Sequence, residues 1–462
     1  MNEAAAPCST SPIAQPPSAL GRRWKPYPAY KDSGVEWLGQ IPAHWEVKPL
    51  KHVANFINGF AFKPDEWGLE GTPIIRIENL NGGEDFNCTA RKLPAKYCAD
   101  RGDLLFGWSG NRGTSFGPFL WWRDGMHYVN QHIFRVVDFD ADKTWMYWVL
   151  RGVTFYVEKQ AHGIIGMVHV TRGELGSIPI PVLPRQEQEQ IAEFLDREHA
   201  KIDALVARKE RLIELLQEKH TALITRAVTK GLDPNVDMKD SGVEWLGQIP
   251  AHWECLSLAR VTLSRCDGPF GSGLKSEHYT GAGMRVIRLQ NIGWAEFSDS
   301  DEAYIDESYA NELGDHSVIA GDLLIAGLGD EGHPVGRACT APEGIEPAMV
   351  KADCFRFRLD RRLLLPEIAA YQLSATASAA AGSLATGATR SRMNLTTMAG
   401  RKVALPPLDE QRAIVKVLDR NGEKCRTLVG GVRDAIDRLK ELRTALISAA
   451  VTGKIDVREE AA

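Results

Sequence analysis

Side chains that can hydrogen-bond to nucleic-acid bases recur in two separate stretches of this chain. An Asn or Gln amide can form two hydrogen bonds with an adenine edge, and an Arg guanidinium can do the same with guanine. Within residues 47–185 the candidates are Asn58, Lys63, Arg76, Asn79, Asn111, Arg112, Gln131, His132 and Arg172. Within residues 255–406 they are Ser272, Lys275, Arg288, Gln290, Asn291, Arg390, Arg392 and Asn394. These residue types predict contacts with base edges or phosphates from loops.

The run TGATRSRMN at 386–394 is the strongest of these candidates, because Gly, Thr and two Arg just before a predicted strand suit a loop that faces phosphate. The run GSGLKS at 271–276 lacks the Gly-Lys-Ser order of a nucleotide-binding loop, so phosphate contact by Lys275 is the better interpretation. Structural roles stay open for all candidates. Arg76 could form an ion pair at a strand edge, His132 could be a structural histidine, and both runs could be solvated turns.

Motifs of catalysis are missing from the sequence. It contains no (D/N)PP(Y/F) motif of adenine methyltransferases, no GxGxxG dinucleotide fingerprint and no GxxxxGK(S/T) phosphate loop. The 8 cysteines are scattered, without a CxxC pair or a His cluster at zinc spacing, and this predicts buried, reduced thiols. We therefore expect no catalytic residues, no metal and no cofactor bound by this chain.

Length and composition predict a globular protein of two or three domains: the chain has 462 residues, of which 44% are hydrophobic and 25% charged. Residues 1–20 are rich in Ala, Pro, Ser and Thr and have no features of a secretion signal, so we expect a disordered tail in a cytoplasmic protein. The longest apolar stretches, such as 145–150, are far shorter than the roughly 20 residues that a membrane helix needs.

The charge balance argues against a protein that holds nucleic acid mainly by its phosphates. The formal net charge is −5, whereas phosphate contacts usually require a basic surface. Residues 47–185 contain 16 basic and 14 acidic side chains, and residues 255–405 contain 15 and 18. Neither stretch is therefore a strongly basic surface.

An internal repeat accounts for the two stretches of candidates. KDSGVEWLGQIPAHWE occurs at 31–46 and again, letter for letter, at 239–254. Behind each copy follow IIRI or VIRL, then GDLL, then FRV or FRF, at offsets of 212, 219 and 221 residues. Order that is kept while spacing drifts indicates a duplicated domain with variable loops, and such loops commonly carry specificity. The repeated segment is expected to pack each domain onto a helix, with direct partner contact as the alternative.

Each half closes with prolines and a long helical segment, which start at IPIPVLPRQEQEQI (178–191) and at LPPLDEQRAI (405–414). Apolar residues then recur every seventh position, the pattern of a coiled-coil seam. The seam is interrupted at Lys209, Lys219, Gly422, Gly430 and Gly431, which predicts that partner helices help to cover it. The expected seam and docking residues are Leu195, Ile202, Leu205, Leu212, Leu216 and Leu223, and then Leu418, Leu428, Val432, Leu439, Leu442 and Leu446.

The opening WKPYPAYKDSGVEWLGQIPAHWE, the run DGPFGSGLKSEHY at 267–279, the proline-marked helix starts and the endings TALITRAVTKG and TALISAAVTGK form a specific combination. It resembles the specificity subunits of type I restriction-modification systems, over nearly the whole chain after the tail. The resemblance implies two target recognition domains that each read half of a split double-stranded DNA site. It also implies helices that pair antiparallel and dock methyltransferase and restriction subunits, with S-adenosylmethionine, ATP and Mg bound by those partners.

The predicted fold class is α+β: two mixed α/β target recognition domains, related by duplication and separated by two long helices in an antiparallel coiled coil. The expected boundaries are a tail and lead-in at 1–30, repeat copy one at 31–46, recognition domains at 47–185 and 255–406, helical spacers at 186–231 and 407–462, and a linker with repeat copy two at 232–254. A coiled-coil protein-binding adaptor without DNA readout is the alternative. A nuclease is less favoured, because no metal-binding carboxylate cluster is evident.

Overall fold

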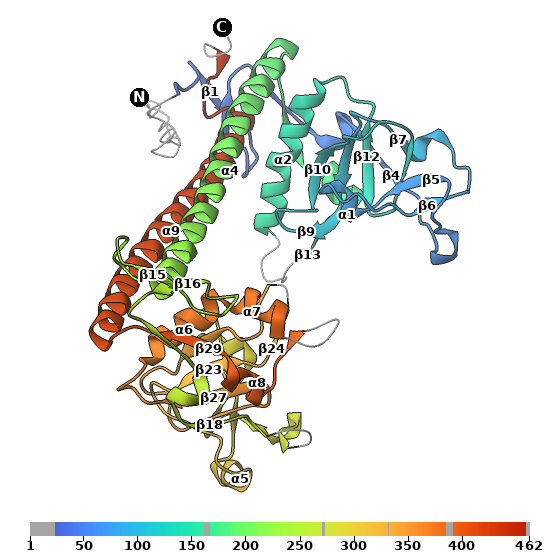
Figure 1. Ribbon diagram of the computed structural model, residues 1–462. Helices are drawn as coiled ribbons and strands as arrows, with labels where there is room; N and C mark the ends of the chain where they lie inside the picture. Colours follow the sequence, from blue (N-terminus) through green and yellow to red (C-terminus); the bar gives the residue numbers. More distant parts are fainter. Residues whose placement is uncertain (1–23, 161–166, 270–272, 331, 385–390, 459–462) are drawn as a thin grey trace, which may run out of the picture. The chain divides into compact units, whose positions relative to one another are not determined.

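The computed structural model describes residues 24–160, 167–269, 273–330, 332–384 and 391–458 (Figure 1). The chain divides into two compact units: unit 1 is Met1–Lys209 with Asp434–Ala462, and unit 2 is Glu210–Arg433. The expected disordered tail lies outside the described residues, and so do the candidates Ser272 and Arg390.

Two four-stranded sheets form the centre of unit 1. The first has the order β10-β8-β12-β4 and is antiparallel, and the second has the order β6-β5-β11-β7, with β11 parallel to β5. Their strands are β4 (Asn55–Asn58), β5 (Thr72–Ile75), β6 (Cys88–Thr89), β7 (Cys98–Ala99), β8 (Leu104–Gly107), β10 (Gly117–Leu120), β11 (His127–Val129) and β12 (Ile133–Val137).

Short ribbons and helices complete unit 1. The two-stranded pairs are β1 (Tyr30–Asp32) with β2 (Gln40–Pro42), β3 (Glu46–Pro49) with β14 (Pro179–Val182), and β9 (Ser109–Asn111) with β13 (Met167–His169). The helices are η1 (Leu50–His52), η2 (Pro64–Glu66), α1 (Ile77–Leu80), η3 (Ala95–Tyr97), α2 (Lys143–Gln160) and α3 (Arg172–Ser177).

Unit 2 repeats this frame. Its sheet β18-β27-β23-β25 has the same order as β4-β12-β8-β10, and a second sheet, β19-β21-β20-β26-β22, again contains one parallel pair, β20 with β26. The strands are β18 (Thr262–Cys266), β19 (Tyr279–Thr280), β20 (Met284–Ile287), β21 (Tyr304–Ile305), β22 (Ser317–Val318), β23 (Leu323–Ala326), β25 (Ala338–Thr340), β26 (Ala348–Val350) and β27 (Cys354–Leu359). The predicted duplication of a mixed α and β domain is confirmed.

The ribbons of unit 2 also correspond to those of unit 1. They are β15 (Met238–Asp240) with β16 (Gln248–Pro250), β17 (Glu254–Ser257) with β29 (Lys402–Leu405), and β24 (Leu328–Gly329) with β28 (Ser391–Arg392). The helices are η4 (Leu258–Val261), η6 (Ser276–His278), η7 (Leu289–Asn291), α5 (Glu307–Glu312), α6 (Pro366–Ala375), α7 (Ala377–Leu384) and α8 (Leu395–Gly400).

The Gly-Asp-Leu-Leu segments show why the frame is kept. Gly102 and Gly321 have φ values of 83° and 80°, a left-handed conformation that favours glycine. In unit 2 the Asp that follows, Asp322, is buried and pairs with Arg358 on the neighbouring strand at 2.8 Å. All residues of β8 and β23 are buried, as expected for central strands that are covered on both faces.

The repeated 16-residue segment packs each domain onto the start of a long helix. In unit 1, His44 Nε2 lies 2.8 Å from Glu187 Oε2, and in unit 2, His252 Nε2 lies 2.9 Å from Glu410 Oε2. Trp253 is completely buried and donates from Nε1 to the same Glu410 oxygen at 3.0 Å. The predicted structural role of the repeat is confirmed.

The two long helices are α4 (Arg185–Lys230) and α9 (Leu408–Val451), and each passes through both units (Figure 1). The prolines that precede both helices explain their starts, since a residue before proline avoids helical geometry. Gly231, with φ of 73°, follows the last residue of α4. In the part of the chain that is described, no helix is both long and apolar enough to cross a membrane.

The helices contact each other within each unit. In unit 1, Arg443 Nη1 donates to Asp203 Oδ1 at 3.1 Å, and in unit 2, Cys425 Sγ lies 3.8 Å from the carbonyl oxygen of Leu216. Of the predicted seam residues, four are buried and five are half-buried: Leu195, Ile202, Leu418 and Leu446, and then Leu216, Leu223, Val432, Leu439 and Leu442.

Three predicted seam residues do not lie in this contact. The side chains of Leu205, Leu212 and Leu428 are 44%, 43% and 55% exposed. The seven-residue count joined them to the buried stripe, but a helix turns by 3.6 residues, so such a stripe drifts away from the partner helix. Each of these leucines is exposed on its helix instead of packing in an internal seam.

Candidate nucleic-acid interface

Two predicted base readers have a structural role. Asn79 and Asn291 are completely buried, and each side-chain amide holds a turn closed. Asn79 Nδ2 donates to the carbonyls of Gly83 and Asp85 at 3.1 and 2.9 Å, and its Oδ1 accepts from Arg76 N at 2.9 Å. Asn291 makes the equivalent three bonds in unit 2. With no exposed surface, neither amide can reach a base edge, which corrects the expectation.

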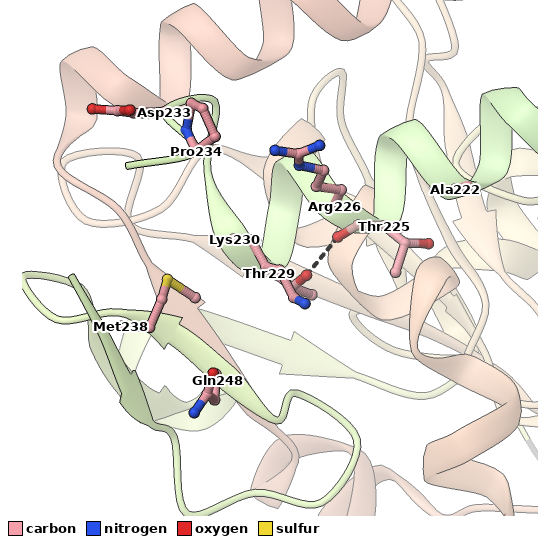
Figure 2. A pocket seen from close by; sticks show the side chains of 9 residues that line it. All are labelled: Ala222, Thr225, Arg226, Thr229, Lys230, Asp233, Pro234, Met238 and Gln248. Atoms are coloured by element: carbon pink, nitrogen blue, oxygen red, sulfur yellow. Dashed lines mark hydrogen bonds between the residues drawn. The ribbon is translucent and has the colours of Figure 1, made fainter. Parts of the chain in front are cut away.

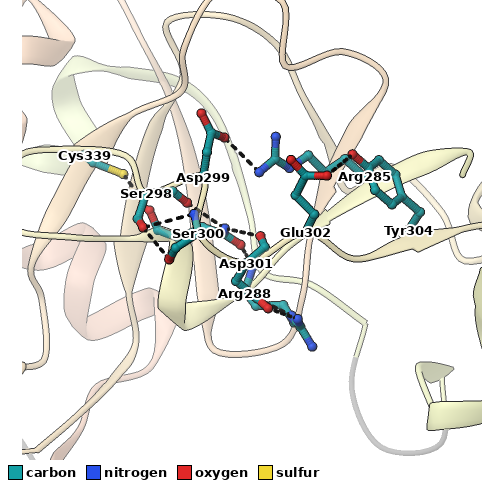
Figure 3. A network of polar contacts seen from close by, with 10 residues as sticks. Arg285, Arg288, Ser298, Asp299, Ser300, Asp301, Glu302, Tyr304 and Cys339 are labelled. Atoms are coloured by element: carbon teal, nitrogen blue, oxygen red, sulfur yellow. Dashed lines mark hydrogen bonds and ion pairs between the residues drawn. The ribbon is translucent and has the colours of Figure 1, made fainter. Parts of the chain in front are cut away.

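The neighbouring arginines are also engaged inside their domains. Arg76 pairs with Glu78 at 2.9 Å and lies over the Trp67 ring at 4.8 Å, so the strand-edge ion pair that was left open is present. Arg288 forms two hydrogen bonds with Asp301. Figure 3 shows this pair within a larger polar network, in which Arg285 Nη2 donates to Asp299 Oδ1 at 2.9 Å.

An exposed polar cluster surrounds Trp108 at one edge of unit 1. The Trp108 ring lies 5.4 Å from that of His132 and 4.9 Å from that of His169, and its Nε1 donates to the carbonyl of Gln131 at 2.8 Å. The side chains of Gln131, His132 and His169 are exposed while Trp108 is half-buried. Of the predicted readers, the structure therefore brings Gln131 and His132 together.

The β9–β13 ribbon adjoins this cluster. Ser109 pairs with His169 and Asn111 pairs with Met167, while Gly110 and Val168 between them are buried. Asn111 and His169 consequently face outward from the same ribbon. Sequence reasoning selected Asn111 but missed His169 and Trp108.

The corresponding edge of unit 2 carries charged side chains. Arg392 Nη2 lies 2.8 Å from Asp353 Oδ1, and Asp267 Oδ1 accepts from the backbone N–H of Asp353 at 3.1 Å and of Gly268 at 2.7 Å. Burial raises the pKa of Asp267 to about 6, and the nearby Asp353 carboxylate acts in the same direction. Arg392 was predicted, whereas the two carboxylates were not.

The other candidates lie on separate surface segments. Lys63 and Lys275 are the residues before η2 and η6, Arg172 begins α3, and Asn394 accepts from Thr397 N at 2.8 Å as the cap of α8. Asn58 ends β4. The exposed side chains of this group are Asn58, Lys63, Arg112, Arg172, Lys275, Gln290 and Asn394.

A pocket in unit 2 contains none of the predicted readers (Figure 2). It lies at the end of α4 and is lined partly by the exposed Arg226 and Lys230; Thr229 Oγ1 beside them donates to the Thr225 carbonyl at 2.6 Å. That bond satisfies a polar group within the helix and indicates no ligand.

The described residues contain no group of three or more His, Cys, Asp or Glu that could hold a metal ion. All described cysteines are free, with Cys339 and Cys354 buried and the rest half-buried. Burial raises the pKa of the Cys339 thiol to about 12, so it stays protonated. The expectation of buried thiols holds for these two.

Comparison with known proteins finds matches in both halves of the duplicated chain. The family model described as "Type I restriction modification DNA specificity domain" matches residues 42–215 and 311–438. The MjaVIII specificity subunit of the type I restriction enzyme from Methanocaldococcus jannaschii is 23% identical, over 91% of this chain and 95% of the relative. The EcoBI specificity subunit from Escherichia coli is 24% identical, over 92% and 89%.

A chain with the same fold occurs in a solved structure that is described as the structural basis of complex assembly and conformational transition of the type I R-M system. The TM-score is 0.57 at 16% identity, over 89% of this chain and 98% of that one. The family match covers more than half of this chain and falls on both copies of the duplicated frame. The chain belongs to the family of type I restriction modification DNA specificity domains.

Proposed function

We propose that this chain is the DNA sequence-specificity subunit of a type I restriction-modification complex and that it has no catalytic activity of its own. The match of both halves to the specificity-domain family carries this proposal. Each unit then reads one half of a split target in double-stranded DNA. Such a subunit works on DNA in the cytoplasm.

The duplicated frame supports a two-part target. Buried positions such as Asn79 and Asn291 are the same in both units, while the exposed edges at Trp108 and Arg392 carry different side chains. Two domains with the same fold but different exposed side chains suit two DNA blocks of different sequence. Half-sites read from one face of a duplex lie near whole turns, about 34 to 36 Å apart, so we expect blocks centred about one turn apart with unspecified bases between them.

The long helices are the proposed docking elements for partners. We propose that α4 and α9 pair as an antiparallel coiled coil and that their exposed leucines bind methyltransferase subunits, with restriction subunits joining the assembly. The exposed leucines Leu212, Leu215 and Leu428 of unit 2 support a protein partner, because water-exposed leucines favour burial. S-adenosylmethionine, ATP and Mg are expected on those partners.

The test is to purify the chain with the methyltransferase encoded beside it and to map methylated bases on host DNA. A two-block motif that is present only when both proteins are expressed supports the proposal. Methyl transfer or cleavage by the pure chain would contradict the non-catalytic role. A chain that binds other proteins while DNA methylation is unchanged by its removal would favour the adaptor alternative.

A further inference from the structure

Tightly packed glycines establish which residues of the two units occupy equivalent places. A Cβ atom at Gly59 would lie 2.1 Å from the carbonyl oxygen of Asn130, and one at Gly268 would lie 2.1 Å from the carbonyl carbon of Lys351. Both distances are far below van der Waals contact, so only glycine fits where these backbones cross. The residue before each glycine, Asn58 or Asp267, therefore holds the same position.

Strand pairing establishes two further equivalences. Ser109 pairs with His169 in the β9–β13 ribbon, and Leu328 pairs with Arg392 in the β24–β28 ribbon. His169 and Arg392 thus hold the same position. In each ribbon the residue that pairs with them, Ser109 or Leu328, is followed by a glycine, Gly110 or Gly329. His132 and Asp353 are likewise equivalent, because each lies two residues before the Phe of the repeated FRV or FRF segment.

The three equivalent positions differ completely in chemistry. Unit 1 has Asn58, His132 and His169, and unit 2 has Asp267, Asp353 and Arg392. A neutral amide and two imidazoles are replaced by two carboxylates and a guanidinium. The neighbouring residue differs as well. Trp108 in unit 1 corresponds to Gly327 in unit 2, where a Cβ atom would lie 2.5 Å from the Phe355 ring.

Four of these six side chains are exposed: Asn58, His132 and His169, and Arg392, whose side chain is 53% exposed. Asp267 and Asp353 are half-buried. Packing does not require particular residues at exposed positions. Because the buried residues of the two units correspond while these exposed ones differ, the two edges are expected to bind different things. A two-stranded ribbon is also narrow enough to enter the major groove, where base edges can be distinguished.

We propose that these three positions determine which bases each recognition domain reads: Asn58, His132 and His169 in unit 1, and Asp267, Asp353 and Arg392 in unit 2. The proposal rests on the proposed function. In unit 2, Arg392 donates to the O6 and N7 atoms of a guanine, the contact that suits a guanidinium. Asp353 is a positioning residue, because its charge-assisted bond fixes the direction of the guanidinium. In unit 1, the Asn58 amide suits an adenine.

The experiment uses the complete complex with its methyltransferase and compares Arg392→Ala with the wild type. Methylation rates are measured on the target and on every single-base change of both blocks. We expect discrimination at one guanine of one block to fall about 5- to 150-fold, the effect of losing one good base contact, with the other block unchanged. The double variant His132→Ala/His169→Ala should relax only the opposite block.

Matched controls are available in both units. Arg362 also pairs with an aspartate, Asp360, at 2.7 Å, but lies outside the proposed edge, so Arg362→Ala should leave both blocks unchanged. His52, an exposed histidine in η1, serves in the same way for unit 1. If Arg392→Ala lowers the unfolding temperature, Arg392→Gln replaces it, since a Gln keeps a polar side chain and still removes the guanidinium.

The outcomes separate this inference from the proposed function. A wild-type complex that methylates no two-block site would contradict both. If the wild type methylates such a site but the folded variants keep every base preference, the inference is wrong and the proposed function stands. A variant that loses affinity equally on all sequences would identify Arg392 as a phosphate contact, which also overturns the inference.

Discussion

At the scale of single residues, the buried amide of Asn79 carries much of the local structure of the first recognition domain. Asn79→Ala removes three hydrogen bonds that this buried side chain makes to backbone groups of a partly buried turn. A hydrogen bond contributes about 0.5–1.5 kcal/mol net, so we expect a loss of about 2 kcal/mol in the free energy of unfolding. Denaturant unfolding measures it, and Asn311→Ala, at an exposed Asn, is the control. Equal stability of the two variants would contradict the assignment.

Asn79 and Asn291 also show where residue type misled the prediction. An amide suits adenine and a closed turn equally well, so type and spacing alone could not separate the two roles. The internal repeat holds a usable signal, because Arg-x-x-Asn recurs at the same offset of 212 residues. Positions that are identical in both copies belong to the common frame, and positions such as His132 and Asp353, which differ, are better candidates for reading.

The raised pKa of Asp267 predicts a pH dependence of stability. Because burial holds this pKa at about 6 in the folded chain, above about 3.9 in an unfolded one, the folded state binds the proton more tightly. The stability that this proton provides is present below pH 4 and is lost as the pH rises through 6. Asp267→Asn should remove this fall while keeping a side-chain oxygen that accepts from the backbone N–H groups of Gly268 and Asp353.

Thermal unfolding between pH 4 and 7 measures this difference. The control is Asp360→Asn, because the hydrogen bonds from Arg362 lower the pKa of Asp360 to about 2. Its contribution to stability changes below pH 4, so the slope between pH 4 and 7 should stay as in the wild type. Parallel curves for Asp267→Asn and the wild type would show that Asp267 is not responsible.

At the scale of elements, two leucines of α4 allow folding and partner binding to be separated. Leu212 is 43% exposed, whereas Leu216 is half-buried and its carbonyl lies 3.8 Å from Cys425 Sγ on α9. Leu212→Asp should keep the fold and lower association with the methyltransferase at least tenfold. Leu216→Asp should lower the unfolding temperature itself. Co-purification and thermal unfolding of the two variants check these expectations. Full association of Leu212→Asp with the methyltransferase would show that Leu212 is not part of the docking surface.

The sequence allowed the long helices to be predicted but not their facing residues. Prolines mark both starts, and the apolar repeat is strong enough to indicate helix. The seven-residue count could not show that Leu205 and Leu428 turn away from the buried stripe, because that depends on how the helices pack. The β9–β13 and β24–β28 ribbons could not be predicted either, since they are two or three residues long and pair across about 60 residues.

At the scale of the whole molecule, the two recognition domains should be exchangeable. Replacing residues 47–185 by the matching domain of a relative should change one block of the methylated motif and leave the other intact, because each block is read by one frame. Lengthening α4 by a short insert near Thr221 should instead widen the gap between unchanged blocks. Methylome mapping checks both, and a swap that rewrites both blocks would contradict modular reading.

The two units differ in one further respect, which concerns the order in which a ribosome makes them. Unit 2 is one continuous segment, Glu210–Arg433, whereas unit 1 needs Asp434–Ala462 as well. Val451, Ile455 and Val457 are completely buried in the core that also contains Trp45 and Phe106. The last part of the unit 1 core is therefore synthesised only after unit 2 is complete. During translation, unit 2 can complete its fold while unit 1 still exposes apolar surface.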